Sequence, residues 1–197
     1  MAFPADAPIA AVFLDRDGVL NRKAPEGSFI SSWDDFHVLP GVPHALLRLN
    51  RAGLPVIVVS NQRGIALGRC SAAQVEAIHN SFQQFLASGG AHIDAFFVCP
   101  HDVGRCDCRK PLPGLFLQAE ARFPGLSASK CVMIGDALVD MEFGRGLGMT
   151  TILIESDLSL QIPGARQAAE LADVRCASLS EAVDLLLGRE NSGEPTC

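Results

Sequence analysis

The stretch IAAVFLDRDG at residues 9–18 decides the fold, because an unbroken apolar run ends there in two aspartates and a glycine. A continuous apolar run is typical of a strand buried on both faces of a parallel sheet. Two later apolar runs also end in polar residues, SNQ at 60–62 and GD at 135–136. Ligands of open parallel sheets bind beyond the carboxyl ends of the strands, so we expect these three polar clusters to converge on one crevice.

Short apolar runs alternate with amphipathic stretches along the chain, the pattern of a parallel sheet wrapped by helices. We therefore predict a single α/β domain over residues 1–190 with a Rossmann-like sheet, followed by a polar, flexible tail at 191–197. The predicted strands are Ile9–Leu14, Val56–Val59, Ile93–Val98, Cys131–Ile134 and Thr151–Ile154. The predicted helices are Pro43–Ala52, Ala72–Ala87, Pro113–Arg122, Leu138–Gly146, Ala165–Leu171 and Ser180–Leu187.

The composition excludes several classes of function. The 197 residues are 48% hydrophobic and 19% charged, which suits one compact domain rather than a disordered chain. The net charge of −6 leaves no basic face for nucleic acid. No apolar run reaches the roughly 18–20 residues that span a bilayer, and the N-terminus lacks the pattern of a secretory signal. We expect a soluble, monomeric, cytoplasmic protein that binds neither nucleic acid nor membrane.

Asp15 and Asp17 place two carboxylates two residues apart at a predicted strand end. Alone, this pattern also fits an ordinary acidic turn, whereas a calcium loop is excluded because the following positions lack the required oxygen ligand and glycine. Asp136 and Asp140 raise the local count to four carboxylates. Two charges at about 4 Å repel by roughly 4 kcal/mol at an effective dielectric near 20, so the cluster requires a divalent cation, and its oxygen ligands favour Mg²⁺. One aspartate is then free to attack in line and the other to handle the proton.

Three of the seven cysteines, Cys99, Cys106 and Cys108, lie with His101 within ten residues. Three thiolates and an imidazole can complete a tetrahedral zinc site, although the tight C-x-C spacing leaves free buried cysteines as an alternative. Cys99 and Arg105 also have the C-x5-R spacing of cysteine-based phosphatases, in which a thiolate attacks phosphate. That alternative places no helix N-terminus at the phosphate and leaves the four aspartates unexplained.

Four segments, taken in order, resemble the motifs of the haloacid dehalogenase-like phosphatases, in particular the group with heptose-bisphosphate and histidinol-phosphate phosphatases. They are FLDRDGVLN at 13–21, VVSNQRGIALG at 58–68, CDCRKPLPG at 106–114 and MIGDALVDM at 133–141. The resemblance runs from about Phe13 to Ile154. Because the segments between the motifs are too short for a separate folded domain, we predict a capless member of this fold.

The resemblance implies a role for each motif residue. Asp15 would be the nucleophile that forms an aspartyl-phosphate, and Asp17 the acid and base, with a pKa raised by neighbouring carboxylates. Ser60 and Lys110 would hold the phosphoryl oxygens. Mg²⁺ would be bound by Asp15, Asp136 and the backbone carbonyl of Asp17, with Asp140 orienting Lys110 or a metal-bound water. Structural zinc at residues 99–108 would fix the direction of Arg109 and Lys110.

The substrate implied is a small phosphorylated metabolite, first of all a bisphosphorylated heptose, with histidinol phosphate or another sugar phosphate as alternatives. We expect Asn61, Arg63 and Arg109 to contact the leaving group or a second phosphate. Two positions depart from the pattern of the heptose enzymes, Ala137 where lysine is expected and Leu67 where arginine is expected. The contrasting class is a catalytically silent, zinc-containing binding module.

Overall fold

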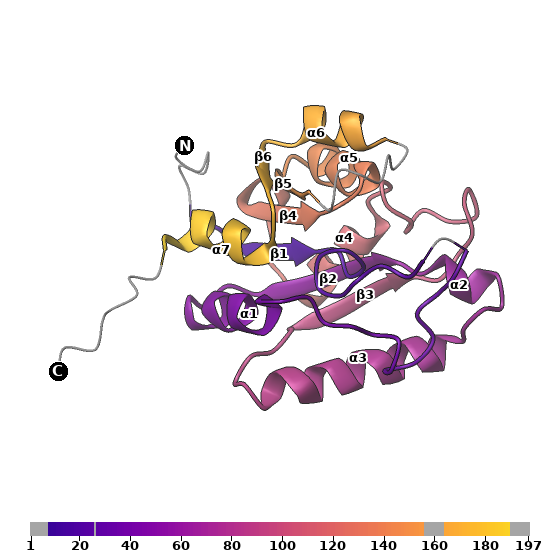
Figure 1. Ribbon diagram of the computed structural model, residues 1–197. Helices are drawn as coiled ribbons and strands as arrows, with labels where there is room; N and C mark the ends of the chain where they lie inside the picture. The colour runs from indigo at the N-terminus through magenta and orange to yellow at the C-terminus, as the bar shows by residue number, and fades with distance from the viewer. Residues whose placement is uncertain (1–7, 26, 156–163, 190–197) are drawn as a thin grey trace.

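The structure is a computed structural model that describes residues 8–25, 27–155 and 164–189, and within these ranges six parallel strands form one sheet (Figure 1). In chain order the strands are β1 (Ala11–Leu14), β2 (Val56–Asn61), β3 (Ala95–Cys99), β4 (Cys131–Gly135), β5 (Thr150–Ile154) and β6 (Val174–Cys176). Their order across the sheet is β3-β2-β1-β4-β5-β6. Successive strands are added on one side of β1 up to β3 and on its other side from β4 onward, so the topological switch point lies between β1 and β4. In open parallel sheets, ligands bind at the carboxyl ends of the strands beside this point. The predicted α/β class is confirmed.

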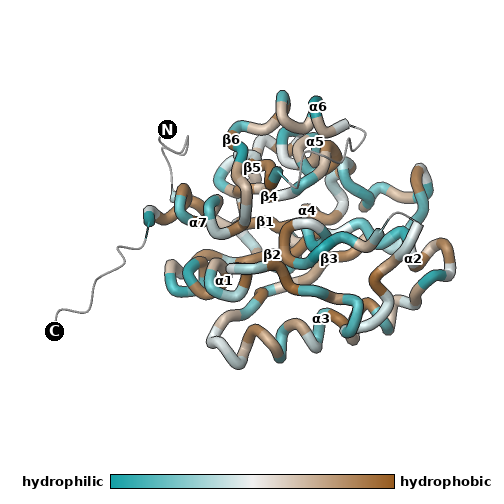
Figure 2. The backbone as a smooth tube through the Cα atoms, in the orientation of Figure 1, coloured by the Kyte–Doolittle hydropathy of each residue, from teal (hydrophilic) through white to brown (hydrophobic). Residues whose placement is uncertain are grey.

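Seven helices are present among the described residues, in two layers that cover the sheet. They are α1 (Val42–Arg51), α2 (Arg63–Ala66), α3 (Ala72–Ala87), α4 (Gly114–Arg122), α5 (Leu138–Leu147), α6 (Ala165–Leu171) and α7 (Leu179–Leu187). Along α3 the tube alternates between hydrophobic and hydrophilic residues, as expected of a helix with one buried face (Figure 2).

Strict alternation of side chains along the strands sorts the core into two halves. Val12 and Leu14 of β1 pack with apolar residues of α1, α3 and α7 on one face of the sheet. Ala11 and Phe13 pack with α4 and α5 on the other face, where Phe13 lies 5.7 Å from Phe116 between ring centroids. The strand end at Asp15 is thereby held between two buried layers.

The differences from the sequence prediction lie at short or polar elements. β6 has only three residues and contains Arg175, and α2 has only four, so neither has a periodic apolar pattern. The predicted strand Ile93–Val98 is shifted to Ala95–Cys99, which puts Cys99 inside the sheet. Between β1 and β2 the described residues form a loop and α1 only. The predicted tail, residues 191–197, lies outside the described residues.

None of the helices in the described part of the chain is long and apolar enough to cross a membrane.

Candidate active site

The carboxyl ends of β1, β2 and β4 bring the predicted polar clusters together around Lys110. The Lys110 ammonium is 2.8 Å from Asp15 Oδ1 and 2.6 Å from Asp140 Oδ1. It also donates a hydrogen bond of 2.7 Å to the carbonyl oxygen of Val59 at the end of β2. The Lys110 side chain is only 1% exposed, so its charge is neutralised by these partners rather than by water. Contact with Lys110 is one of the two roles that the sequence indicated for Asp140.

Three carboxylates form a compact group beside this lysine. Asp15, Asp136 and Asp140 each contribute one oxygen atom, and these atoms all lie within 4.8 Å of one another. Oδ1 of Asp136 is buried and has no hydrogen-bond partner among the described residues. Gly18 has a φ of +99° and closes over the group, because a Cβ atom there would lie 1.9 Å from Asp136 Oδ2. A group of three carboxylates with an unpartnered oxygen atom fits a hard divalent cation.

The protonation of this group reflects burial and mutual repulsion. Burial, together with Asp140 and Asp17, raises the pKa of Asp15 to about 6 despite the nearby Lys110. Burial likewise raises the pKa of Asp136 to about 7, although an ion pair with Lys23 works in the opposite direction. In both residues the desolvation that comes with burial outweighs the attraction of the neighbouring lysine.

Asp17 stands apart from the carboxylate group, and the prediction that crowding raises its pKa is wrong. Nη2 of the buried Arg16 donates to Oδ1 and Oδ2 of Asp17 at 3.0 and 2.9 Å. Asn21 Nδ2 donates to Oδ1 at 2.9 Å, and Gln62 Nε2 donates to Oδ2 at 2.8 Å. Burial acts to raise the pKa of Asp17, but the Arg16 charge and these hydrogen bonds outweigh it and lower the pKa. Asp17 is thus held as a carboxylate.

Ser60 is joined to Asp17 through one intermediate side chain. Gln62 Nε2 donates to Ser60 Oγ at 2.8 Å as well as to Asp17. Ser60 is buried inside β2, one residue before the strand ends, whereas the sequence prediction ended the strand at Val59. Gln62 therefore links the hydroxyl predicted to hold a phosphoryl oxygen with the predicted acid and base.

The three predicted substrate contacts are in different situations. Both polar atoms of the Asn61 side chain pair with the Lys110 backbone at 3.0 Å, so this amide holds the lysine in place. Arg63 Nε lies 2.5 Å from Asp102 Oδ1 in an exposed ion pair. Arg109 has a buried Nη1 atom without a hydrogen-bond partner among the described residues. Of the three, Arg109 has the donor most readily available to an anion.

The cysteine cluster closes around a common centre. Cys99 Sγ is 3.5 Å from Cys106 Sγ and 3.8 Å from His101 Nδ1, and His101 Nδ1 is 3.3 Å from Cys108 Sγ. Tetrahedral zinc, with bonds of about 2.3 Å to sulfur and about 2.0–2.1 Å to nitrogen, separates its ligand atoms by about 3.5–3.8 Å. The four side chains thus have the spacing of a zinc site.

The same geometry disfavours Cys99 as a nucleophile. Cys99 is completely buried at the end of β3, and burial raises the pKa of its thiol. A nucleophilic cysteine needs a lowered pKa and access to the substrate. Arg105, its partner in the C-x5-R spacing, is an exposed loop residue.

A family model described as haloacid dehalogenase-like hydrolase matches residues 9–148, most of the described chain. The chain belongs to the haloacid dehalogenase-like hydrolases. The match spans β1 to α5 and so includes every predicted site residue.

Curated relatives of this hydrolase carry one activity in their names. A Mycobacterium tuberculosis protein named D-glycero-alpha-D-manno-heptose-1,7-bisphosphate 7-phosphatase is 40% identical over 171 residues, which are 86% of this chain and 87% of the relative. A Bordetella bronchiseptica protein named as the 7-phosphatase of the beta form is 36% identical over 147 residues, covering 74% and 80% of the two chains. A crystal structure of the D,D-heptose 1.7-bisphosphate phosphatase from B. bronchiseptica, complexed with magnesium and phosphate, matches with a TM-score of 0.79 at 30% identity, covering 91% of this hydrolase and 98% of that chain.

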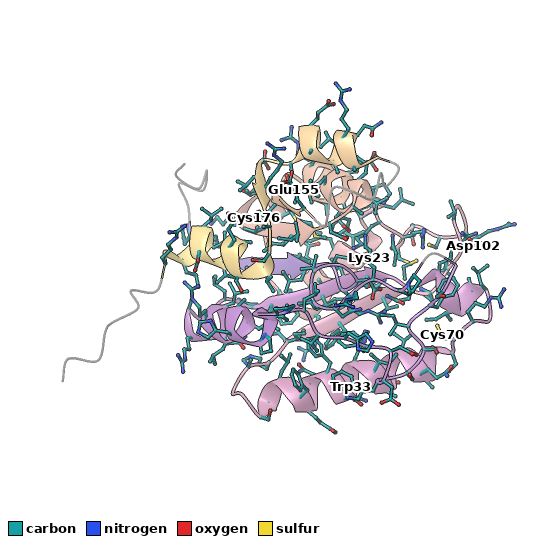
Figure 3. All side chains as sticks on the ribbon, in the orientation of Figure 1. Lys23, Trp33, Cys70, Asp102, Glu155 and Cys176 are labelled. Atoms are coloured by element: carbon teal, nitrogen blue, oxygen red, sulfur yellow. The ribbon has the colours of Figure 1, made fainter. Side chains whose placement is uncertain are left out.

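Four residues of the hydrolase site were given no role of their own from the sequence: Arg16, Asn21, Gln62 and Lys23. Arg16 stands inside the first motif, but arginine between two aspartates gives no sign that it will be buried. Gln62 follows Ser60 and Asn61, so its proximity to the site was foreseeable, but its bridging role was not. Lys23 comes from the loop before α1, and only the folded loop places it near Asp136 (Figure 3).

Proposed function

We propose that this hydrolase is a Mg²⁺-dependent phosphomonoesterase that removes the 7-phosphate of D-glycero-D-manno-heptose 1,7-bisphosphate through an aspartyl-phosphate on Asp15. The observation that carries the proposal is the buried Lys110 between Asp15 and Asp140, next to the unpartnered carboxylate oxygen of Asp136. The names of the relatives and the magnesium and phosphate in the B. bronchiseptica structure support the substrate and the metal.

Asp15, Asp136 and the backbone carbonyl of Asp17 are the groups that would hold Mg²⁺. When bound, the ion supplies positive charge that offsets the carboxylates and the phosphoryl oxygens. Lys110 and the Ser60 hydroxyl would hold phosphoryl oxygens at the same strand ends. Arg109, with its unpartnered buried nitrogen, is the best candidate for contact with the second phosphate or the sugar.

The reaction balances as two displacements at phosphorus. An oxygen of Asp15 attacks, the bond between phosphorus and the C7 oxygen breaks, and Asp17 gives its proton to the departing alkoxide. Asp17, now a carboxylate, takes a proton from water, which attacks the aspartyl-phosphate and releases inorganic phosphate and Asp15. The contacts with Arg16, Asn21 and Gln62 favour the carboxylate needed in the second step. The first step starts from protonated Asp17, so Asp17 must take up a proton from solvent as those contacts loosen when the substrate binds.

The zinc loop has a structural role in this proposal. Cys99, His101, Cys106 and Cys108 would fill all four positions of a tetrahedral Zn²⁺ ion, leaving none for substrate. The loop leads directly to Arg109 and Lys110, so the ion would fix where both cations point. The ligand distances above and the C-x-H-x4-C-x-C pattern support it.

Phosphate release from a panel of substrates tests the proposed function. The panel contains the alpha and beta anomers of heptose 1,7-bisphosphate, other sugar phosphates and histidinol phosphate, each with Mg²⁺ or with EDTA, and Asp15→Asn is the control. We expect Mg²⁺-dependent release from a heptose bisphosphate and none from Asp15→Asn. Preference for histidinol phosphate would retain the mechanism and change the substrate. If the folded protein released no phosphate from any substrate of the panel, the alternative of a catalytically silent, zinc-containing binding module would be favoured.

We further expect a monomer that acts in the cytoplasm without nucleic acid or membrane partners. The net charge of −6 supports the absence of a nucleic-acid surface. Light scattering coupled to size-exclusion chromatography checks the oligomeric state.

A further inference from the structure

Lys23 is a cation at the active site that the mechanism above does not use. It lies in the loop between β1 and α1 (Figure 3), and its Nζ atom is 2.6 Å from Asp136 Oδ2. Its stem runs over Gly18, where an added Cβ atom would lie 2.9 Å from Lys23 Cε. The Lys23 side chain is 39% exposed, whereas the side chain of Asp136 is fully buried. The ammonium group therefore enters the carboxylate group from the solvent side.

The charge of Lys23 acts on the same carboxylates that would hold Mg²⁺. Besides Asp136, both Asp15 and Asp140 interact with it electrostatically. Lys110 and Lys23 together leave one net negative charge on the three carboxylates. A divalent ion in place of Lys23 would make the group neutral, whereas both cations together would repel each other next to Asp136.

The two lysines differ in how easily they can leave. Lys110 is buried and held by two carboxylates and a backbone carbonyl. Lys23 has one close partner and a flexible four-carbon stem with access to water, so its ammonium group can withdraw into water when Mg²⁺ takes its place beside the buried Asp136. After withdrawal, the Lys23 ammonium group stays near the carboxylates because its stem is tethered to the loop between β1 and α1. On this solvent-facing side it would meet an incoming anionic substrate.

We propose that Lys23 is an exchangeable counter-ion, which pairs with Asp136 in the metal-free enzyme, yields that carboxylate to Mg²⁺, and then faces the incoming phosphate ester. This inference rests on the proposed function, because it requires Mg²⁺ to bind at Asp136. It has two consequences. Lys23 weakens Mg²⁺ binding to the free enzyme, and it strengthens substrate binding to the Mg²⁺-loaded enzyme.

Three variants test the proposal. Lys23→Met keeps the apolar stem and removes the charge, and Lys23→Arg keeps the charge. Lys130→Met removes one charge from an exposed lysine before β4, at the amino end of the strand and away from the site, and controls for net charge. Mg²⁺ binding to each substrate-free protein is measured by isothermal titration calorimetry, and the melting temperature is measured with and without Mg²⁺.

We expect Lys23→Met to lower the Kd for Mg²⁺ about tenfold, since a competing cation is gone. Its metal-free form should melt below the wild type, and Mg²⁺ should raise its melting temperature by more than that of the wild type. At saturating Mg²⁺ the KM for the substrate should rise several-fold, and more than kcat falls. Lys23→Arg and Lys130→Met should bind Mg²⁺ like the wild type.

An unchanged or weaker Mg²⁺ affinity in Lys23→Met would overturn the proposal. Tighter Mg²⁺ binding with an unchanged KM would overturn the substrate role and leave Lys23 as a counter-ion only. If the wild type itself bound no Mg²⁺, the proposed function would fail, and the calorimetry would show this separately from any effect of Lys23.

Discussion

Asn61 pairs with both backbone polar groups of Lys110, since its Nδ2 donates to the lysine carbonyl oxygen and its Oδ1 accepts from the lysine amide. The sequence indicated a substrate contact for this residue, because it follows Ser60 at a strand end. In the structure the Asn61 side-chain amide instead pairs with the backbone of Lys110. A residue that positions a catalytic group affects the rate of the chemical step more than substrate binding.

We therefore predict that Asn61→Ala lowers kcat about 10- to 100-fold and changes KM by less than about threefold, because a small displacement of Lys110 misplaces its charge. Steady-state kinetics on the preferred phosphate ester measures both constants. The exposed Asn80 on α3 provides a matched control, Asn80→Ala, which should behave like the wild type. A large rise in KM with an unchanged kcat would restore Asn61 as a substrate contact.

His79 is a buried titratable residue in α3. Its ring stacks on Phe96 at 4.2 Å between centroids, and its Nε2 has no hydrogen-bond partner among the described residues. Burial, followed by the positive charge of Arg16, lowers the pKa of His79 from 6.5 to about 3. In the unfolded chain His79 takes up a proton near pH 6.5, whereas in the folded chain it does so only near pH 3. Protonation therefore favours the unfolded chain, and the free energy of unfolding decreases as the pH falls from 6.5 toward 3.

Because of this difference, the wild type should lose about 2 kcal/mol more unfolding free energy than His79→Phe between pH 7.5 and pH 5. Urea denaturation at the two pH values gives both free energies. His37→Phe, which removes an exposed histidine, is the control. Equal acid sensitivity of the wild type and His79→Phe would show that His79 is not kept neutral by the fold.

At the scale of elements, the loop from β3 to α4 joins the cysteine cluster to Lys110, the proposed catalytic lysine. Cys99 is the last residue of β3, and Cys108 precedes Lys110 by two residues. Gly114, the first residue of α4, closes the loop, since a Cβ atom there would lie 2.7 Å from the Asp107 carbonyl oxygen. The loop contributes little apolar core of its own, so a metal would be its main stabilising element.

Cys106→Ser should lose zinc, melt at least about 5 °C lower and have reduced kcat, because one of four ligands is gone. Metal analysis, thermal melting and kinetics provide the readouts. Cys99→Ser should have the same effects, and Cys176→Ser, a buried cysteine in β6, should retain the zinc. If Cys99→Ser were inactive while Cys106→Ser kept full activity, the cysteine nucleophile would replace the aspartate mechanism.

The elements that could be predicted are those with a strong local pattern. β1, β2, β4 and β5 are apolar runs buried on both faces, and α3 has a regular apolar spacing and a capping box at Ser71. β6 and α2 are too short for a periodic pattern, and their formation depends on neighbours: β6 pairs with β5, and α2 follows the turn at Gln62. Tertiary contacts therefore decide them.

At the scale of the whole molecule, the sheet order explains why the site could be predicted at the level of motifs. Parallel strands with a switch point between β1 and β4 bring Asp15, Ser60 and Asp136 to one edge, although they are far apart in sequence. The hydrogen-bond and charge partners of the individual site residues could not be predicted in the same way. The low pKa of Asp17 and the approach of Lys23 depend on how Arg16 and the loop before α1 pack, and spacing along the chain does not encode this.

The central claim is that Asp15 accepts the phosphoryl group, and rapid-quench mass spectrometry tests it most directly. The wild type is mixed with heptose 1,7-bisphosphate and Mg²⁺, quenched in acid within one turnover, digested and analysed for phosphorylated peptides. We predict a transient phosphoryl group on the peptide that contains Asp15, formed before phosphate is released and absent in Asp15→Asn. Phosphate release without any label on Asp15, or a label on Cys99, would contradict the account.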